Sequence, residues 1–113
     1  MSDNTFAAIG FTLVGLLYIG LGIPLFLQRV RPNAWYGART RKTRSSETIW
    51  YAVNRITGRD LIIGGVAVVI TASCIYLFGQ EMEPSHSATI LLVVLVSSVI
   101  VMAVDSLIAE RSM

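Results

Sequence analysis

Residues 61–79, "LIIGGVAVVITASCIYLFG", contain no charged residue. Two more stretches share this property: residues 5–27, "TFAAIGFTLVGLLYIGLGIPLFL", and residues 87–104, "SATILLVVLVSSVIVMAV". A bilayer core about 30 Å thick is crossed by roughly 20 apolar residues, because a helix rises about 1.5 Å per residue. Apolar residues make up 54% of the 113-residue chain, more than a small soluble domain can bury. The sequence therefore predicts an all-α integral membrane protein, a single membrane domain over residues 1–113 with three transmembrane helices.

The ends of the apolar stretches define the predicted segments. Buried helices of a soluble bundle would need polar faces, which these stretches lack. A cleaved signal peptide explains the first stretch poorly, because its flank "MSDN" carries no Lys or Arg. The expected order is a first transmembrane helix over about 5–27, a cytoplasmic connection over 28–60, a second transmembrane helix over 61–79, an external turn over 80–86 and a third transmembrane helix over about 87–109.

The basic residues lie almost entirely between the first two apolar stretches. Eight of the nine Lys and Arg are there, and the ninth, Arg111, follows the third stretch. The other side of the predicted spans carries Asp3, Glu81, Glu83 and His86. Short loops rich in Lys and Arg stay in the cytoplasm. We therefore expect the N-terminus outside and both the connection and the C-terminus inside.

Part of the connection, residues 46–57, is predicted to be a short amphipathic helix at the cytoplasmic membrane surface. "SSE" at 45–47 is typical of a helix start, with a hydroxyl cap and an acid in the first turn. Gly58 is expected to end this helix. Trp50, at the edge of the apolar arc, is expected to anchor it at the headgroup level. At 100° per residue the arc contains Ile49, Trp50, Ala52, Val53 and Ile56, and the polar side opposite contains Glu47, Thr48, Tyr51, Asn54 and Arg55.

Eleven residues of the connection follow the order and spacing of a known signature. They are Asn33, Tyr36, Gly37, Arg39, Thr40, Thr43, Glu47, Trp50, Asn54, Arg55 and Gly58. The pattern resembles that of the SdpI family, approximately N-x-x-[FY]-G-x-R-T-x-x-T followed by an acid, W, [NH]-[RK] and G. Arg41 and Lys42 depart from it, since an apolar pair is expected there. The resemblance implies a bacterial inner-membrane protein that gives immunity to a secreted peptide toxin or signals its presence.

The residues favour binding over catalysis. The sequence contains no phosphate-binding Gly-rich loop, no His/Cys ligand spacing and a single Cys74, so we expect no enzyme, metal or cofactor. The basic connection suits anionic lipid headgroups, whereas a net charge of +2 argues against nucleic acid. Two functions stay open: SdpI-like immunity or sensing, and an accessory subunit that packs on a larger membrane protein complex. The oligomeric state is open as well.

Two roles also stay open for the eleven motif residues. Their polar groups suit a clasp that folds the connection against the bundle, or a docking surface for a partner protein or a lipid headgroup. Asp105 is an ionisable residue near the end of the third span, where a charge is costly unless paired. Its expected partner is Arg39, followed by Arg55 or Arg59. Small residues at heptad spacing predict close helix packing: Gly15 and Gly22, and Gly65, Ala72 and Gly79.

Overall fold

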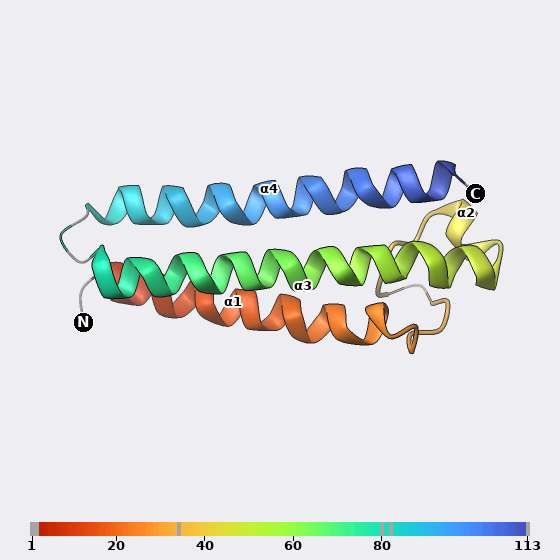
Figure 1. The fold of residues 1–113 in the computed structure, drawn as a ribbon, viewed down its shortest axis with the longest axis horizontal. Helices are drawn as coiled ribbons and strands as arrows, with labels where there is room; N and C mark the ends of the chain where they lie inside the picture. Colours follow the sequence, from red (N-terminus) through yellow and green to blue (C-terminus); the bar gives the residue numbers. More distant parts are fainter. Residues whose placement is uncertain (1–2, 34, 80, 82, 113) are drawn as a thin grey trace.

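The protein is a bundle of three long helices with a short fourth helix at one end (Figure 1). The computed structural model describes residues 3–33, 35–79, 81 and 83–112. Three of the helices are long and apolar enough to cross a membrane, which confirms the predicted all-α fold with three membrane-spanning helices. The elements in chain order are α1 (Asp3–Phe26), α2 (Arg41–Arg44), α3 (Glu47–Phe78) and α4 (Pro84–Arg111).

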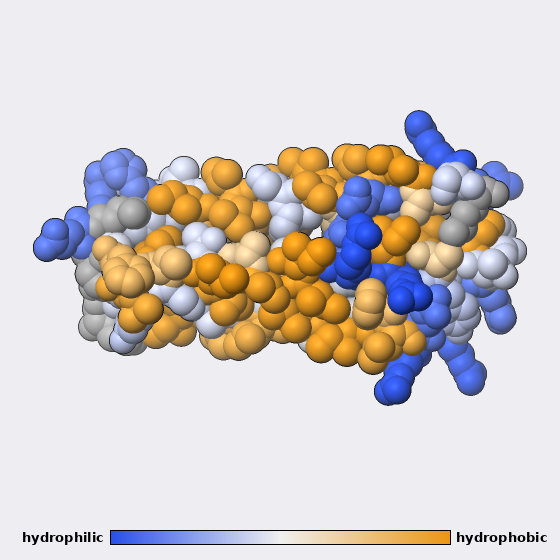
Figure 2. Space-filling view, viewed as in Figure 1, coloured by the Kyte–Doolittle hydropathy of each residue, from blue (hydrophilic) through white to orange (hydrophobic). Residues whose placement is uncertain are grey.

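The two ends of the bundle differ in composition. The start of α1 lies beside the α3–α4 turn, whereas the α1–α3 connection, α2 and the end of α4 lie at the opposite end (Figure 1). Hydrophobic residues cover the middle, and hydrophilic residues lie at both ends and extend further along the α2 end (Figure 2). The long axis measures 51 Å, which exceeds a hydrocarbon core of about 30 Å. The bundle is therefore long enough to cross the core and to project beyond it.

The two helices predicted over 46–57 and 61–79 form one continuous helix, α3, so the expected helix end at Gly58 is wrong. Gly58 is buried inside α3, and a Cβ there would collide with the backbone of Gly22 and Phe26 on α1. The glycine thus allows a close helix contact and does not terminate the helix. At about 1.5 Å per residue, the 32 residues of α3 span about 48 Å. Whether the first three turns lie at the membrane surface stays a prediction.

Glycines bring α1 and α3 into close contact along their length. A Cβ on Gly22 would lie 2.6 Å from the carbonyl oxygen of Gly58, and one on Gly65 would lie 2.5 Å from that of Gly15. Distances this short leave no room for a side chain at either position. Close approach of this kind lets membrane helices gain van der Waals contact. The packing predicted from Gly15, Gly22 and Gly65 is confirmed.

Asn4, which the sequence analysis did not single out, joins the three long helices at the end opposite α2. Its Nδ2 donates to the carbonyl oxygen of Gly79 across 3.1 Å, and its Oδ1 accepts from the Ser87 hydroxyl across 2.7 Å. Asn4 is 2% exposed and Ser87 is fully buried. A small apolar core of Ala8, Ala72, Ile75 and Leu91 belongs to the same three helices.

Candidate functional site

Asn54 of α3 holds the α1–α3 connection in place. Its Oδ1 accepts the backbone N–H of Ala38 across 2.5 Å, and its Nδ2 donates to the carbonyl oxygen of Trp50 across 3.0 Å. Gly37, with φ +103°, makes the turn that presents Ala38 to Asn54. A Cβ on Gly37 would lie 2.5 Å from Asn54 Oδ1, so both the backbone angle and the available space favour glycine.

Asn33 shapes the segment before this turn. Its Oδ1 accepts the backbone N–H groups of Trp35 and Tyr36 across 2.9 and 2.8 Å, which is an Asx turn. The Tyr36 hydroxyl then donates to the carbonyl oxygen of Leu21, close to the end of α1. Partial burial raises the pKa of Tyr36 above its usual value of 10.0, which favours the protonated hydroxyl that this bond requires. The turn therefore ties the connection to α1.

Thr40 and Thr43 fasten α2 to the bundle. The backbone N–H of each residue donates to the hydroxyl of the other, which is a reciprocal capping box. The Thr43 hydroxyl also donates to the carbonyl oxygen of Ala38 across 2.9 Å. The Thr40 hydroxyl donates to Glu110 Oε1 across 2.8 Å, and Lys42 Nζ donates to the Glu110 carbonyl oxygen across 2.7 Å. The connection is thus joined to α4 as well as to α1 and α3.

Trp50 lies beneath the connection and is closed off from its surroundings, so its predicted role as an anchor at the headgroup level is wrong. Its side chain is fully buried, and its Nε1 donates to the carbonyl oxygen of Val30 across 2.8 Å. The buried face of the early turns of α3 is rotated from the predicted arc, because the connection covers Asn54 on its expected polar side. The residues buried there are Trp50, Val53, Asn54, Thr57 and Gly58, whereas Ile49, Ala52 and Ile56 are partly exposed.

Ten of the eleven motif residues separate into two sets. In the first, which we call the polar clasp, Gly37 makes a turn and six side chains hydrogen-bond within the chain: Asn33, Tyr36, Thr40, Thr43, Trp50 and Asn54. In the second set, Arg39, Glu47 and Arg55 are exposed, and the Arg55 guanidinium lies 5.1 Å from the centre of the Phe26 ring. Gly58 completes the motif at the α1–α3 contact. The clasp sets the shape of this end and leaves three charged side chains on its surface.

Arg59 is the partner that the structure shows for Asp105. Its Nη2 lies 3.3 Å from Asp105 Oδ2. The observed partner is therefore Arg59 of α3, the last of the three expected candidates, and not Arg39, the first. Nearby, the hydroxyls of Thr57 and Ser106 are hydrogen-bonded across 2.7 Å. Both pairs join α3 to α4 at the end of the bundle that carries the clasp.

Asp60 is a candidate site residue that the sequence analysis did not single out. It is 7% exposed, and its Oδ1 accepts from Arg59 across 3.1 Å. Its Oδ2 is buried without a hydrogen bond to any residue that the structure describes. Spacing alone contains a signal, since Thr57, Asp60 and Gly64 lie at i, i+3 and i+7 on one helix face.

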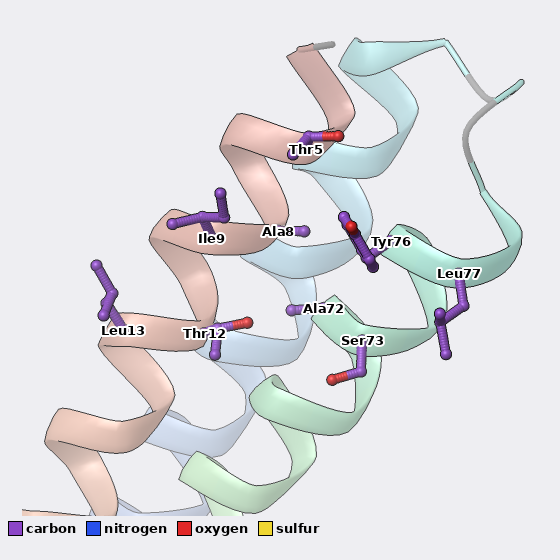
Figure 3. Close-up of a pocket in the computed structure, with 9 residues that line it drawn as sticks. All are labelled: Thr5, Ala8, Ile9, Thr12, Leu13, Ala72, Ser73, Tyr76 and Leu77. Carbon is purple, nitrogen blue, oxygen red and sulfur yellow. The ribbon is translucent and has the colours of Figure 1, made fainter. Parts of the chain in front are cut away.

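A groove of about 560 Å³ lies at the opposite end of the bundle, between α1 and α3 (Figure 3). Apolar side chains such as Ile9, Leu13 and Leu77 make up most of its wall, and Ala8 and Ala72 approach each other between the helices (Figure 3). The groove is therefore an apolar feature of the membrane-spanning part, separate from the clasp.

Three long apolar helices and a connection folded onto one end define a multi-pass membrane protein. The family model described as the SdpI/YfhL protein family matches residues 29–105, which is more than half of the chain. The chain belongs to this family, as its motif predicted. The matched region contains the polar clasp and the cluster of Arg59, Asp60 and Asp105. Comparison with curated proteins and with solved structures finds no match.

Proposed function

We propose that this protein acts by binding at the bacterial inner membrane, in immunity to a peptide toxin or in sensing it. Family membership supports this proposal, since the chain belongs to the SdpI/YfhL family. The observation that carries it is the polar clasp, which joins one connection to all three long helices. Its side chains bond mainly to backbone groups, an arrangement that suits a fixed docking surface better than a reactive centre.

The proposed docking surface is the exposed basic side of the connection. Arg39, Arg41 and Arg44 are exposed there, and Arg44 lies with Ser45 beside Arg41 along a polar hollow. Exposed guanidinium groups bind carboxylates and phosphates well. The surface therefore suits an acidic segment of a partner protein or anionic lipid headgroups.

A toxin-survival assay tests this function. The gene would be deleted in the source bacterium, and survival would be measured during exposure to culture supernatant of toxin-secreting cells. We expect deletion to lower survival and the wild-type protein to restore it. Asn54→Ala, which opens the clasp, should restore less than the matched exposed variant Thr48→Ala when both reach equal membrane levels. Unchanged survival of the deletion strain would contradict the immunity function.

The second candidate is an accessory subunit of a larger membrane protein complex. The observation in its favour is the sparse burial of α4, whose described apolar side chains are buried only at Leu91 and Ala109. Exposed Leu92, Val96 and Ile100 can contact lipid or another membrane protein. Purification in mild detergent separates the two functions. A stoichiometric large assembly would support the subunit, and an isolated protein whose loss sensitises cells would support immunity.

A further inference from the structure

Asp60 and Asp105 share a single guanidinium group at the contact between α3 and α4. Arg59 Nη2 lies 3.1 Å from Asp60 Oδ1 and 3.3 Å from Asp105 Oδ2. Arg59 Nε also donates to Asp60 Oδ1 across 3.1 Å. With both carboxyl groups ionised, these three residues carry one excess negative charge. Within a membrane-spanning bundle such an excess is costly, because little water is present to solvate it.

The environment of Asp60 adds a second, independent observation. Its side chain is 6% exposed, and the buried Oδ2 has no hydrogen bond to the described residues. An ionised carboxylate would keep its ion pair with Arg59 through Oδ1, but its Oδ2 would be desolvated without a hydrogen bond of its own. Asp60 Oδ1 and Asp105 Oδ2 contact the same nitrogen, Arg59 Nη2, so the two carboxyl groups are neighbours. Two neighbouring carboxyl groups can form a hydrogen bond with each other only when one of them carries a proton.

The surrounding elements provide few other charges near Asp60. On α3, Arg55 lies over Phe26 of α1, and α1 between residues 4 and 26 contains no Asp, Glu, Lys or Arg. The titratable residue within that part of α1 is Tyr18. Towards the clasp, Lys42 bonds to Glu110 of α4, while Arg41 and Arg44 are exposed on α2. Among the described residues, the charges in contact with the acid pair are therefore that of Arg59 and those of the two acids themselves.

We propose that Asp60 and Asp105 form a proton-binding site in which one proton is shared between their carboxyl groups. The proton comes from water and gives Asp60 Oδ2 a hydrogen-bonding role. It also brings the cluster with Arg59 to a net charge of zero. Asp60 Oδ2 is closed to solvent, which leaves little space for a larger ligand. A proton fits this position because it needs no additional volume. The site does not depend on what the protein binds at the membrane. Its test and the test of the proposed function are therefore separate.

Carboxyl-selective NMR tests this site in the full-length protein in lipid nanodiscs. The chain contains three aspartates, Asp3, Asp60 and Asp105, so ¹³Cγ-aspartate labelling gives three carboxyl signals. At pH 7 we expect one signal at the chemical shift of a carboxylic acid. Asp60→Asn and Asp105→Asn should each abolish it, because the remaining acid then pairs with Arg59 alone. Asp3→Asn, at the opposite end of the bundle, is the matched control: it removes one carboxylate signal and should leave the acid signal in place.

Three results would overturn the proposal. Three carboxylate signals in the wild type would mean that no proton is bound. An acid signal that persists in both single variants would mean that the proton is not shared between the two residues. Carboxyl shifts that change when K⁺ is replaced by Na⁺ at constant pH would identify a metal cation as the occupant. If Asp60→Asn does not fold, Asp105→Asn decides the test, since Asp105 is the more exposed partner at 34%.

Discussion

Trp50 of α3 donates its indole N–H to the backbone carbonyl oxygen of Val30, with 2.8 Å between Nε1 and O. The two residues are 20 positions apart, and the Trp50 side chain is fully buried. A residue of the helix thus holds the start of the connection from below, while Asn54 holds its middle at Ala38. The shape of the clasp end therefore depends on side chains that are themselves hidden from solvent.

Two replacements of Trp50 should destabilise the protein to different extents. Trp50→Phe keeps most of the apolar contact but leaves the Val30 carbonyl unpaired, at an expected cost of about 1–3 kcal/mol. Trp50→Ala also opens a cavity and should cost about 3–5 kcal/mol. Thermal unfolding in detergent measures both. Trp35→Phe is the matched control because Trp35 is 85% exposed, and an equal loss at both tryptophans would contradict the buried anchor.

Asn54→Ala should release the connection without unfolding the long helices. The N–H of Ala38 loses its buried acceptor, at a cost of about 1–3 kcal/mol. Hydrogen exchange at Ala38 should therefore become about tenfold faster or more, and trypsin should cut sooner after Arg39. Thr48→Ala, at an exposed position of the same helix, should leave both rates unchanged. Exchange at the wild-type rate in Asn54→Ala would show that other contacts hold the turn.

Gly58→Ala and Gly20→Ala should have opposite effects. Both sites are helical, and alanine favours a helix over glycine by about 1 kcal/mol. A Cβ at Gly20 meets nothing within 4 Å, so Gly20→Ala should raise the midpoint of thermal unfolding. A Cβ at Gly58 would meet the α1 backbone and force the helices apart, so Gly58→Ala should lower it. A higher midpoint for both variants would contradict the close contact.

The contrast at Gly58 shows how far the sequence could predict this protein. Three apolar stretches sufficed for the spanning helices, because length and hydropathy depend on local sequence alone. Gly58 is typical of a helix end in its local sequence, yet its role depends on its contact with Gly22 on another helix. Helical periodicity places Asn54 on a polar face, and only the turn at Gly37 brings its partner, Ala38, to it. Asp60 gives little local signal, because Asp105, the acid that shares Arg59 with it, lies on α4, 45 residues later in the chain.

A double-mutant cycle should couple Arg59 with Asp105. Arg59→Gln should cost more stability than Asp105→Asn, because Arg59 contacts two carboxyl groups. Their side chains are 50% and 34% exposed, so the expected coupling energy is about 1 kcal/mol. Thermal unfolding of the single and double variants measures it. Arg41→Gln, at an exposed position of α2, should combine additively with Asp105→Asn. Additive losses for Arg59 would sink the pairing.

The orientation in the membrane is the last prediction, and it rests on the concentration of Lys and Arg at one end of the bundle. Single cysteines at positions 3, 85 and 45 would be introduced in a Cys74→Ala background, since Cys74 is exposed in the structure. The first two positions lie at one end and the third at the other, because α1 begins at Asp3, α4 begins at Pro84 and Ser45 precedes α3. Short loops rich in Lys and Arg stay in the cytoplasm, so an impermeant thiol reagent added to intact cells should label positions 3 and 85 but not 45. Labelling of position 45 alone would show that the bundle has the opposite orientation. The basic surface would then face outward, where it could meet a secreted toxin directly.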